Sequence, residues 1–573
     1  MPVHNRDIAE IFNKVADLLE IEGANQFRVR AYRNAARTIE NLPQSAADLV
    51  EKGEDLSQLS GIGKDLAGKV AEIVRTGELE MLKELEARTP PDLGEMMAIA
   101  GLGPKRVQAL HKELGINSLA DLKEAAEQEK IREVSGFGAK TEQKILKGIK
   151  ELTGKKKRFL LKEVEEIAQS LLKHLQKVKG IKDVVVAGSY RRRQETVGDL
   201  DILATCERGS QVMEALVGYE DVEEVAAQGK TRSTVILHAG LQVDLRVLAQ
   251  ESFGAALHYF TGSKAHNIAV RTLGVQRGLK INEYGVFQGN KRVAGKTEEE
   301  VYAKVDLPYI EPELRENRGE IEAAQKGKLP KLITLKDIRG DLHTHTKVTD
   351  GRHTLEEMAE AARERGYDYL AITNHSQRVT MTHGLDAKRL RRELEKIDRF
   401  NDSAPGIRVL KAIEVDILED GRLDLPDEVL RELDFTVCSV HYNRNMSREQ
   451  MTERILRAMD NPYFHILGHP TGRLLGRREP YEVDLEKLLE TAQDYGCFME
   501  LDSQPDRLDL TDVYCKRAKE MGVKVAVSTD AHSVAELEYM RFGLGQARRG
   551  WLEADDVINT RTWGELKKLF QRK

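Results

Sequence analysis

The segment GSYRRRQETVGDLDIL, residues 188–203, runs from a glycine-serine pair through three arginines to an apolar stretch that opens with two aspartates. A β-strand places residues i and i+2 on one face, so Asp199 and Asp201 would lie side by side. Two carboxylates that close raise each other's pKa unless a positive charge lies between them. A helical pattern and a β-rich run, KDVVVAGSY, precede them. The segment therefore predicts an α+β unit with a cation site where a strand begins.

A third acid, Asp244 in LQVDLRVL, falls on another predicted strand. Three carboxylates from two strands make an oxygen-rich site that suits Mg²⁺ or Mn²⁺. Two such ions could flank a phosphoryl group and promote an in-line displacement. Asp-x-Asp is also common on protein surfaces, so a solvated loop is the alternative at this stage.

The composition predicts a chain of several domains. At 573 residues the length suggests roughly three or four. A hydrophobic fraction of 40%, 32% charged residues and a net charge of -6 allow ordinary cores and exclude a uniformly basic surface. Basic residues instead cluster at 28–37, 155–158, 191–193 and 473–480, where they could attract phosphates or simply cover solvated helix faces.

The four cysteines form neither a disulfide framework nor a CxxC zinc site. They are expected to be small core residues in a reducing compartment. We find no signal peptide and no apolar run of membrane-spanning length. The expectation is a cytoplasmic protein without a membrane partner.

One pattern occurs three times in the first 150 residues: LSGIGKDLAGKV (59–70), IAGLGPKRVQAL (99–110) and VSGFGAKTEQKI (134–145). Each glycine pair permits a tight turn whose N–H groups open onto the next helix, which is a ready anion site. A single pair is weak evidence, because glycine also serves close helix packing. Three copies beside lysine or arginine resemble helix-hairpin-helix modules, which hold DNA phosphates without reading sequence. The glycines concerned are Gly61, Gly63, Gly101, Gly103, Gly136 and Gly138.

Two later motifs, YFTGSKAHNIAVR (259–271) and GLKINEYGVF (278–287), are more specific. Together with the Asp-x-Asp strand they closely resemble the palm and thumb of family X DNA polymerases. The upstream GSYRR resembles the phosphate loop of the nucleotidyltransferase superfamily. The resemblance implies that Mg²⁺ or Mn²⁺ binds in the palm and that dNTPs are substrates.

The resemblance also implies a role for individual residues. Asp199 and Asp201 would bind both metals, and Asp244 would bind the catalytic metal and help deprotonate the primer 3′-hydroxyl. A second set would contact the nucleotide or the DNA. The triphosphate would be bound by Gly188, Ser189, Arg192 and Gly198, and the wall that crowds a ribose 2′-OH would be formed by Tyr259, Phe260 and Gly262. Asn267 would contact the minor-groove edge of the nucleotide, and Arg271 would contact the template strand. The alternatives are core aromatics for Tyr259 and Phe260 and a solvated helix residue for Arg271.

Four residues depart from the family pattern, two in the palm and two beside a candidate lyase lysine. Val197 stands where a serine often touches the triphosphate, and Gln242 stands where an arginine adjoins the third aspartate. Lys69 falls at the position of the Schiff-base lysine that removes a 5′-deoxyribose phosphate. The neighbouring phosphate-binding lysines of the animal enzymes are replaced by Asp65 and Met81, so an exposed lysine without lyase activity is the alternative.

A second group of candidate ligands lies towards the carboxyl end. Each sits at the end of a β-rich run, and seven such runs, CFMELD included, alternate with helical segments. In a β/α barrel that end of the strands is the mouth of the active site. A lone histidine there is usually packed or hydrogen-bonded, but buried charges in this number need partners. The mixed set suits Zn²⁺, Mn²⁺ or Fe²⁺. The nine residues are His343, His345, Asp350, His375, Glu414, His441, His469, Asp530 and His532.

This pattern resembles the PHP (polymerase and histidinol phosphatase) domain over residues 337–573. The resemblance implies a distorted seven-stranded barrel with three metal ions. Asn374 departs from it, because the family usually has aspartate before the motif histidine. Arg473, Arg477 and Arg478 could bind substrate phosphates, with surface salt bridges as an equally open alternative.

The residues and the resemblances together predict a multidomain chain. We expect an all-α helix-hairpin-helix region, an α+β nucleotidyltransferase palm with a thumb, and a distorted (β/α)7 barrel. The expected domains are 1–80, small, helical and lyase-like; 81–150, helix-hairpin-helix fingers; 151–252, palm; 253–315, thumb; 316–336, a polar linker with some helix; and 337–573, PHP domain.

The implied function is a DNA polymerase that fills short gaps in base excision repair, with a metal-dependent 3′–5′ exonuclease and an abasic-site endonuclease in the PHP domain. Expected partners are gapped or nicked double-stranded DNA, dNTPs and a DNA ligase, and the expected state is a monomer. Two alternatives stay open: a phosphoesterase for small phosphate monoesters, and a DNA-end scaffold whose centres have decayed.

Overall fold

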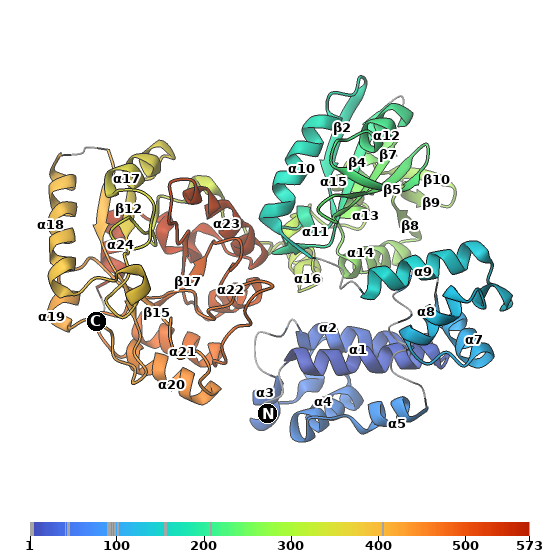
Figure 1. Ribbon diagram of the computed structural model, residues 1–573, viewed down its shortest axis with the longest axis horizontal. Helices are drawn as coiled ribbons and strands as arrows, with labels where there is room; N and C mark the ends of the chain where they lie inside the picture. The colour runs from blue at the N-terminus through green and yellow to red at the C-terminus, as the bar shows by residue number, and fades with distance from the viewer. Residues whose placement is uncertain are drawn as a thin grey trace. The chain divides into compact units, whose positions relative to one another are not determined.

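The protein is described by a computed structural model over residues 5–40, 42, 46–88, 93, 96, 99, 102–153, 158–206, 209–403 and 406–571. The chain forms two compact units, residues 1–157 and 158–573. Figure 1 colours the first unit in blues and the second from green to red. No described helix is both long and apolar enough to cross a bilayer.

The described part of the first unit is helical. Its helices are α1 (Asn5–Ile21), α2 (Gln26–Glu40), α3 (Ala46–Glu51), α4 (Lys64–Thr76), α5 (Glu80–Arg88), α7 (Pro104–Leu114), α8 (Leu119–Glu127) and α9 (Ala139–Thr153). Helix α1 buries Ile8, Phe12, Val15 and Leu19, the spacing of one helical face. Phe12 meets Tyr32 of α2 edge to face, with ring centroids 5.5 Å apart. Burial of this face joins α1 to α2 in one core.

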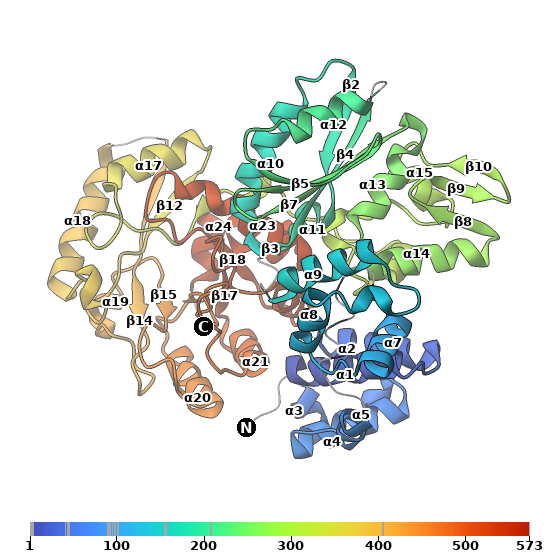
Figure 2. The ribbon, with the colours of Figure 1, turned by 45° about the vertical axis from the view of Figure 1, so that its right-hand side comes forward.

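The second unit begins with a palm region, residues 158–252, built on a five-stranded mixed sheet. The strand order is β2 (Ile181–Val186), β4 (Asp199–Cys206), β7 (Gln242–Leu248), β6 (Arg232–Leu237) and β5 (Val222–Gln228). Strands β4 and β7 run parallel, and the other neighbours are antiparallel. Helices α10 (Leu161–Leu175) and α12 (Gly209–Val217) cover one face. Strands β4 and β7 lie side by side in Figure 2, as the register requires.

The thumb region, residues 253–336, follows the sheet. Its elements are α13 (Phe253–Thr261), α14 (Lys264–Gln276), β8 (Leu279–Asn282), β9 (Gly285–Gln288), β10 (Lys291–Ala294), α15 (Glu298–Ala303) and α16 (Glu320–Gln325). Helix α13 packs on the second face of the palm sheet. The expected linker 316–336 is part helical, but it does not run through solvent. Ile321 and Ala324, three residues apart on one face of α16, are buried in the thumb core, and Leu332 beyond the helix joins them there.

The barrel region, residues 337–571, consists of parallel strands alternating with helices. One sheet has the order β11 (Gly340–Asp341), β12 (Tyr369–Ile372), β13 (Arg408–Lys411), and the other has β14 (Glu414–Asp416), β15 (Val437–Ser439), β16 (Ile466–Leu467), β17 (Phe498–Asp502), β18 (Val525–Ser528). Two residues separate β13 from β14, so the seven predicted runs appear as eight short strands. Parallel bridges between Thr344 and Ala531 and between His375 and Glu414 join the two sheets.

The barrel interior and its outer layer have separate cores. Tyr369, Phe435 and Phe498 belong to the inner core, where Phe570 stacks on Phe435 at a centroid distance of 4.6 Å. The surrounding helices pack against the outward faces of the strands. These are α17 (Leu355–Glu364), α18 (Ala387–Ser403), α19 (Asp427–Leu430), α20 (Arg448–Met459), α21 (Leu485–Tyr495), α22 (Asp512–Glu520) and α23 (Met540–Arg549). Helix α24 (Trp563–Leu569) instead contributes Leu566 to the inner core.

Candidate active sites

The predicted palm carboxylates lie on two neighbouring parallel strands. Asp201 on β4 faces Asp244 on β7, and Asp199 faces Gln242 two residues earlier. Alternate residues share a face, so Asp199 and Asp201 lie on the side of Leu203, which packs near α13. Asp199 is exposed and Asp244 is buried. The structure thus brings the three residues to one corner of the sheet.

Asp201 lies in surroundings that favour a bound cation. Burial raises the pKa of Asp201 to about 7, and the carboxylates of Asp199 and Asp244 add to the rise. Arg246 and Arg192 oppose it without cancelling it. Among the described residues, the three carboxylates form no group whose oxygens all lie within 4.8 Å of one another. Mutual repulsion explains the wider spacing, and a divalent ion would relieve it.

The glycine-serine turn approaches this corner directly. Gly188 has a φ of +64°, and a Cβ built on it would lie 2.8 Å from Oδ2 of Asp201. Only glycine combines that backbone conformation with so close a contact. Ser189 follows in the short helix α11 (Gly188–Arg191), and Gly198 lies beside Arg158. The predicted phosphate loop and the acidic strand therefore form one site.

Asp244 is held by three donors from its own sheet. Its Oδ1 accepts hydrogen bonds from Thr234 at 2.6 Å and Arg232 at 3.2 Å, and its Oδ2 accepts one from Gln242 at 2.7 Å. Burial would raise the pKa of Asp244, but these donors outweigh it and hold the pKa below its usual value. Gln242 keeps a donor where the family has arginine, and Arg232 supplies the positive charge. Sequence reasoning missed Thr234 and Arg232, which only the β6–β7 register brings beside Asp244.

The predicted nucleotide wall lies where α13 passes into α14. The amide nitrogen of Asn267 donates to the Tyr259 carbonyl at 2.7 Å, while its Oδ1 is buried and without a hydrogen bond in the described part of the chain. An unsatisfied buried acceptor of this kind suits a donor on a ligand. Phe260 also serves the core: it packs near Ala187 and Leu203. Both predicted aromatics therefore lie at the site, one of them with a structural role as well.

Three further predicted contacts differ in their surroundings. A Cβ on Gly262, whose φ is +67°, would lie 3.3 Å from Nη1 of Arg192. Arg271 is exposed on α14. Val197, where the family often has serine, is fully buried in the palm core and pairs with Phe159. No hydroxyl is therefore available at residue 197.

Arg192, predicted to bind the triphosphate, is fixed by groups from outside the palm region. It donates to Glu316 at 3.0 Å and to the Thr261 carbonyl at 2.5 Å. Arg549 of the barrel region donates to the same Glu316 oxygen and to the Arg192 carbonyl, each at 2.9 Å. Burial would raise the pKa of Glu316, but Arg549, Arg192 and Arg318 lower it to about 2. Arg192 is thus positioned through a carboxylate that the barrel region helps to hold.

The repeated glycine turns of the first unit have the expected helix-hairpin-helix geometry. Gly63 and Gly103 are the N-cap residues of α4 and α7, and neither helix has a side-chain cap. The N–H groups of each first turn are therefore open to an anion. Gly61 and Gly136 have φ values of +82° and +87°, which favour glycine. Gly101 lies outside the described residues.

Lys69 is not simply exposed on its helix. Its side chain is 18% exposed and forms an ion pair with Asp65 one turn earlier. The carboxylate that replaces an expected phosphate-binding lysine thus pairs with the lysine amine. The lyase role stays a prediction.

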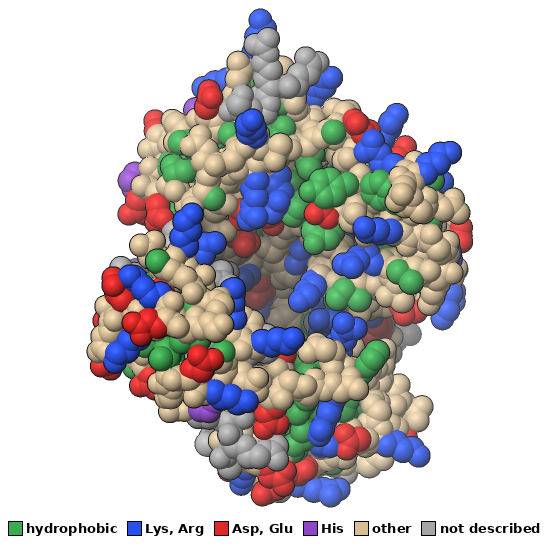
Figure 3. Space-filling view, turned by 90° about the vertical axis from the view of Figure 1, so that its right-hand side faces the viewer, with side chains coloured by type: hydrophobic (Ala, Val, Ile, Leu, Met, Phe, Trp, Pro, Cys, Tyr) green, Lys and Arg blue, Asp and Glu red, His purple; other side chains and the backbone are tan. Residues whose placement is uncertain are grey.

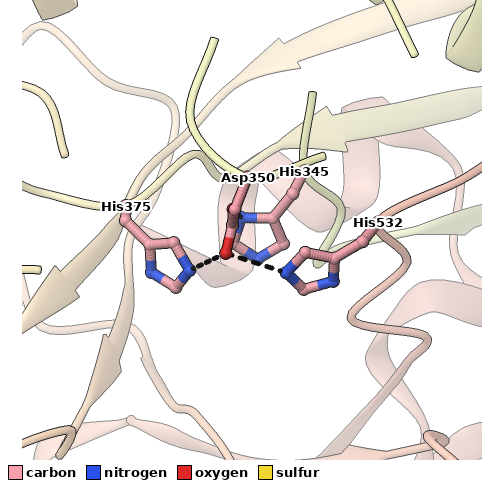
Figure 4. A group of neighbouring side chains, drawn as sticks. All are labelled: His345, Asp350, His375 and His532. Atoms are coloured by element: carbon pink, nitrogen blue, oxygen red, sulfur yellow. Dashed lines mark hydrogen bonds and ion pairs between the residues drawn. The ribbon is translucent and has the colours of Figure 1, made fainter. Parts of the chain in front are cut away.

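The nine predicted ligands of the barrel region meet at the carboxyl ends of its strands. Eight of them make three overlapping groups whose ligand atoms lie within 4.8 Å of one another: His345, Asp350, His375 and His532; His343, His345 and Asp530; His375, Glu414 and His441. Figure 4 shows Asp350 pointing between His375 and His532, at 3.1 and 3.3 Å, with His345 beside them. His469 contacts Glu414 at 3.0 Å. His345 and His375 are each shared by two groups, which suits a cluster of adjacent ions.

The chemistry of this donor set fits divalent metals. His343 Nε2 and both ring nitrogens of His345 are buried and lack a well-directed hydrogen bond among the described residues. Burial, together with His532 and His375, lowers the pKa of His345 to about 3, so this imidazole is neutral. A neutral, unsatisfied imidazole beside carboxylates is a ligand for Zn²⁺, Mn²⁺ or Fe²⁺.

Two carboxylates that the sequence reasoning did not assign orient the rings of two histidines, and one of them also holds the backbone of a third. Glu500 contacts Nδ1 of His343 at 2.7 Å and accepts the His469 backbone N–H at 2.7 Å. Asp416 contacts Nδ1 of His441 at 2.9 Å. Such contacts fix which ring nitrogen faces the metal. The sequence does carry a signal for Glu500 and Asp416. Each belongs to a pair of acids at alternate positions of an apolar run, FMELD or AIEVDI.

Asn374 organises the loop that carries two ligands. Its Oδ1 accepts hydrogen bonds from the Thr346 N–H at 2.9 Å and the Thr349 hydroxyl at 3.0 Å. The same hydroxyl lies 3.1 Å from Oδ1 of Asp350, which is an alternative acceptor for its one hydrogen. The departure from the family's aspartate thus falls on a residue that supports the ligand loop rather than on a ligand.

The three arginines of TGRLLGRREP have separate surroundings. Arg473 is paired with Glu195 of the palm region at 2.7 Å. Arg477 is 72% exposed and lies 3.7 Å from Asp506. Arg473 and Arg477 therefore each have a carboxylate neighbour, Arg473 in a largely buried position and Arg477 at the surface, and phosphate binding by them stays a prediction. Arg478 has no ion pair among the described residues.

Positive charge is not confined to one region. Figure 3 shows many lysine and arginine side chains interspersed with acidic ones over one face of the molecule. The mixture agrees with 89 basic and 95 acidic residues in the chain. Local clusters rather than net charge must supply phosphate binding.

Comparisons with known protein families match four parts of the chain. Residues 3–79 match a helix-hairpin-helix domain and residues 93–151 a SAM-like helix-hairpin-helix tandem. Residues 256–316 match the DNA polymerase beta thumb, and residues 341–504 match the PHP domain.

Individual proteins extend these matches. The chain is 38% identical to the DNA polymerase/3'-5' exonuclease PolX of Bacillus subtilis (strain 168) over 574 residues, which covers 100% of both. It is 32% identical to a probable phosphatase of Thermoanaerobacter sp. (strain X514) over 246 residues, 41% of this chain and 94% of that protein. It is 28% identical to DNA polymerase lambda of Arabidopsis thaliana over 352 residues, 55% of this chain and 62% of that protein.

Proposed function

The chain belongs to the family X DNA polymerases that carry a C-terminal PHP domain, and on that basis we propose how its two sites divide the work. The protein is a DNA polymerase with a 3′–5′ exonuclease, and it fills short gaps in DNA repair. The observation that carries the division is the presence of two separate ligand sets in one chain. One is the carboxylate corner of the palm region, and the other is the nine-residue cup of the barrel region.

In the palm, Asp199, Asp201 and Asp244 would hold Mg²⁺ or Mn²⁺. Ions bound there supply Lewis-acid stabilisation of nucleotidyl transfer. Gly188 lets its loop lie against Asp201. A triphosphate bound by that loop would therefore lie beside the carboxylates. The Asn267 acceptor would orient the incoming nucleotide.

In the barrel, all nine predicted residues would take part in holding up to three ions. Zn²⁺, Mn²⁺ or Fe²⁺ bound there would supply the chemistry for phosphodiester hydrolysis. Glu500 and Asp416 keep the ring nitrogens of His343 and His441 turned for this purpose. An abasic-site endonuclease could use the same cup.

The helix-hairpin-helix turns would hold DNA, since their open N–H groups match backbone phosphates. Gapped duplex DNA and dNTPs are the proposed ligands of the whole protein. A ligase partner, a monomeric state, a cytoplasmic location and the lyase role of Lys69 stay predictions.

A second candidate function comes from a probable phosphatase that aligns over 94% of its own length with 41% of this chain. On that hypothesis the cup hydrolyses small phosphate monoesters. The scaffold hypothesis is weaker, because a decayed protein would be expected to have lost ligands from one centre.

The test uses purified protein and a duplex with a one-nucleotide gap, in Mg²⁺ or Mn²⁺, with and without dNTPs. We expect Asp201→Ala to abolish extension alone and His345→Ala to abolish 3′-end degradation alone. Loss of both activities in either variant would contradict two independent centres. Release of phosphate from monoesters without DNA degradation would favour the phosphatase function, and binding without either reaction would favour the scaffold.

A further inference from the structure

A cavity of about 830 Å³ adjoins the barrel's ligand cup. The candidate metal ligand His441 forms part of its wall, so the cavity opens from the cup itself. The remainder is formed by the loop 442–446, by Gln450 of α20 and by the hairpin that carries Arg478 and one acid, Glu479. Its size lies within the range of pockets that hold a small organic ligand such as a nucleotide.

Two arginines line this cavity without carboxylate partners. Arg444 and Arg478 are half-buried, and neither forms an ion pair in the part of the chain that the structure describes. Burial lowers the pKa of Arg478 to about 10, and the nearby Arg444 and Arg507 add to the fall. Asp506 and Asp509 oppose this effect without cancelling it. Cationic groups gathered in this way favour an anionic ligand.

The wall that carries the arginines is fixed by buried groups. Arg454, 2% exposed, donates to the Tyr442 carbonyl at 3.0 Å and to the Leu418 carbonyl at 3.0 Å, which holds the loop after His441. Arg478 donates from Nε to the Gly472 carbonyl at 2.8 Å. Its two terminal nitrogens remain for a ligand. The Arg478 guanidinium and the loop that carries Arg444 are therefore held in place before any ligand arrives.

We propose that Arg444 and Arg478 bind the DNA phosphate next to the one that is cleaved. The inference rests on the proposed nuclease function and names the feature that selects its substrate. A phosphodiester at the cup would have its neighbour along the strand at the cavity, where a paired guanidinium contact suits a phosphate. A phosphate monoester has no second phosphate to place there. The cavity thus favours a polynucleotide over the small substrates of the alternative function.

The kinetic test compares a single-stranded oligodeoxynucleotide with the p-nitrophenyl ester of thymidine 5′-monophosphate, which has one phosphate. The variant is Arg444→Gln/Arg478→Gln, and the control is Arg422→Gln, a 79% exposed arginine of the same region. We expect the double variant to lose at least tenfold in kcat/KM for the oligonucleotide, mainly through KM, and less than threefold for the ester. Equal losses on both substrates, or none on either, would overturn the proposal.

A binding measurement separates this proposal from the nuclease function itself. Calorimetry with Ca²⁺ would compare thymidine 3′,5′-bisphosphate with thymidine 5′-monophosphate. The wild type should bind the bisphosphate at least tenfold more tightly, and the double variant should lose that preference. Absence of degradation by the wild type would defeat the nuclease function, whereas a preference retained by the double variant would defeat the cavity proposal.

Discussion

Replacement of Gly188 by alanine tests the contact between the phosphate loop and the acidic strand. An alanine Cβ would lie 2.8 Å from Oδ2 of Asp201, and the φ of +64° disfavours any side chain. The left-handed conformation costs roughly 1–2 kcal/mol for alanine. Overpacking adds about 1–3 kcal/mol. The simplest relief is rotation of the Asp201 carboxylate, which would displace a proposed metal ligand.

Gly240→Ala is a matched control in the same region. Gly240 has a φ of +84° between β6 and β7, but nothing lies within 4 Å of its Cβ position. It should therefore show only the conformational cost. The difference between the variants isolates the contact with Asp201, which we expect to be about 1–3 kcal/mol. This corresponds to roughly a 5- to 150-fold loss in the rate of nucleotide incorporation.

The assay is single-turnover incorporation on gapped DNA, with thermal unfolding measured in parallel. We expect both variants to lower the melting temperature, and only Gly188→Ala to slow incorporation strongly. Incorporation by Gly188→Ala within threefold of the Gly240→Ala rate would refute the reasoning, because the loop would then tolerate a displaced carboxylate.

Three further predictions concern other parts of the two centres. Arg549→Met leaves Glu316 with fewer cationic partners, and breaking this buried pair should cost about 3–5 kcal/mol of stability. Because Glu316 also holds Arg192, we expect KM for dNTPs to rise about tenfold in steady-state kinetics. A lower melting temperature with unchanged KM would limit the residue to a structural role. Asp201 has a pKa of about 7 against the usual 3.8, so the metal-free fold loses the stabilisation from its bound proton as pH rises from about 4 to 7. Mg²⁺ must displace that proton to bind. The apparent affinity for Mg²⁺ in extension assays should therefore fall about tenfold for each pH unit below 7, and an affinity that does not change with pH would count against the prediction. Asn374→Leu removes the hydrogen bonds that support the ligand loop and should weaken Mn²⁺ binding about 10- to 100-fold. Titration of 3′-end degradation with Mn²⁺ would measure this, and an unchanged affinity would contradict it.

Ion pairs that motifs do not reveal join the barrel region to the palm and thumb regions. Arg549, Arg473 and Arg541 of the barrel region pair with Glu316, Glu195 and Glu165. Buried charges of this kind need partners, and these partners lie hundreds of residues away in the sequence. The arginines of the basic cluster at 473–480 therefore have three different surroundings: Arg473 lies at a domain interface, Arg477 at the surface near Asp506, and Arg478 in the cavity wall.

The sequence by itself determined where the chemistry lies. Alternation along a strand put Asp199 and Asp201 on one face, and strand ends followed by histidine or acid marked the barrel cup. These patterns are local, because a strand's two-residue period and the turn required by a glycine pair depend on adjacent residues. The same local signals predicted helix in the first unit and parallel strands in the barrel.

Only the tertiary structure decided which side chains support those residues. Two donors to Asp244, Thr234 and Arg232, come from β6. Glu500 contacts His343 from a strand far along the chain, and Arg444 is placed with Arg478 only by the folding of the cavity wall. Each depends on which strands and loops become neighbours. That choice is made by burial summed over the whole unit, and no short stretch of sequence records it.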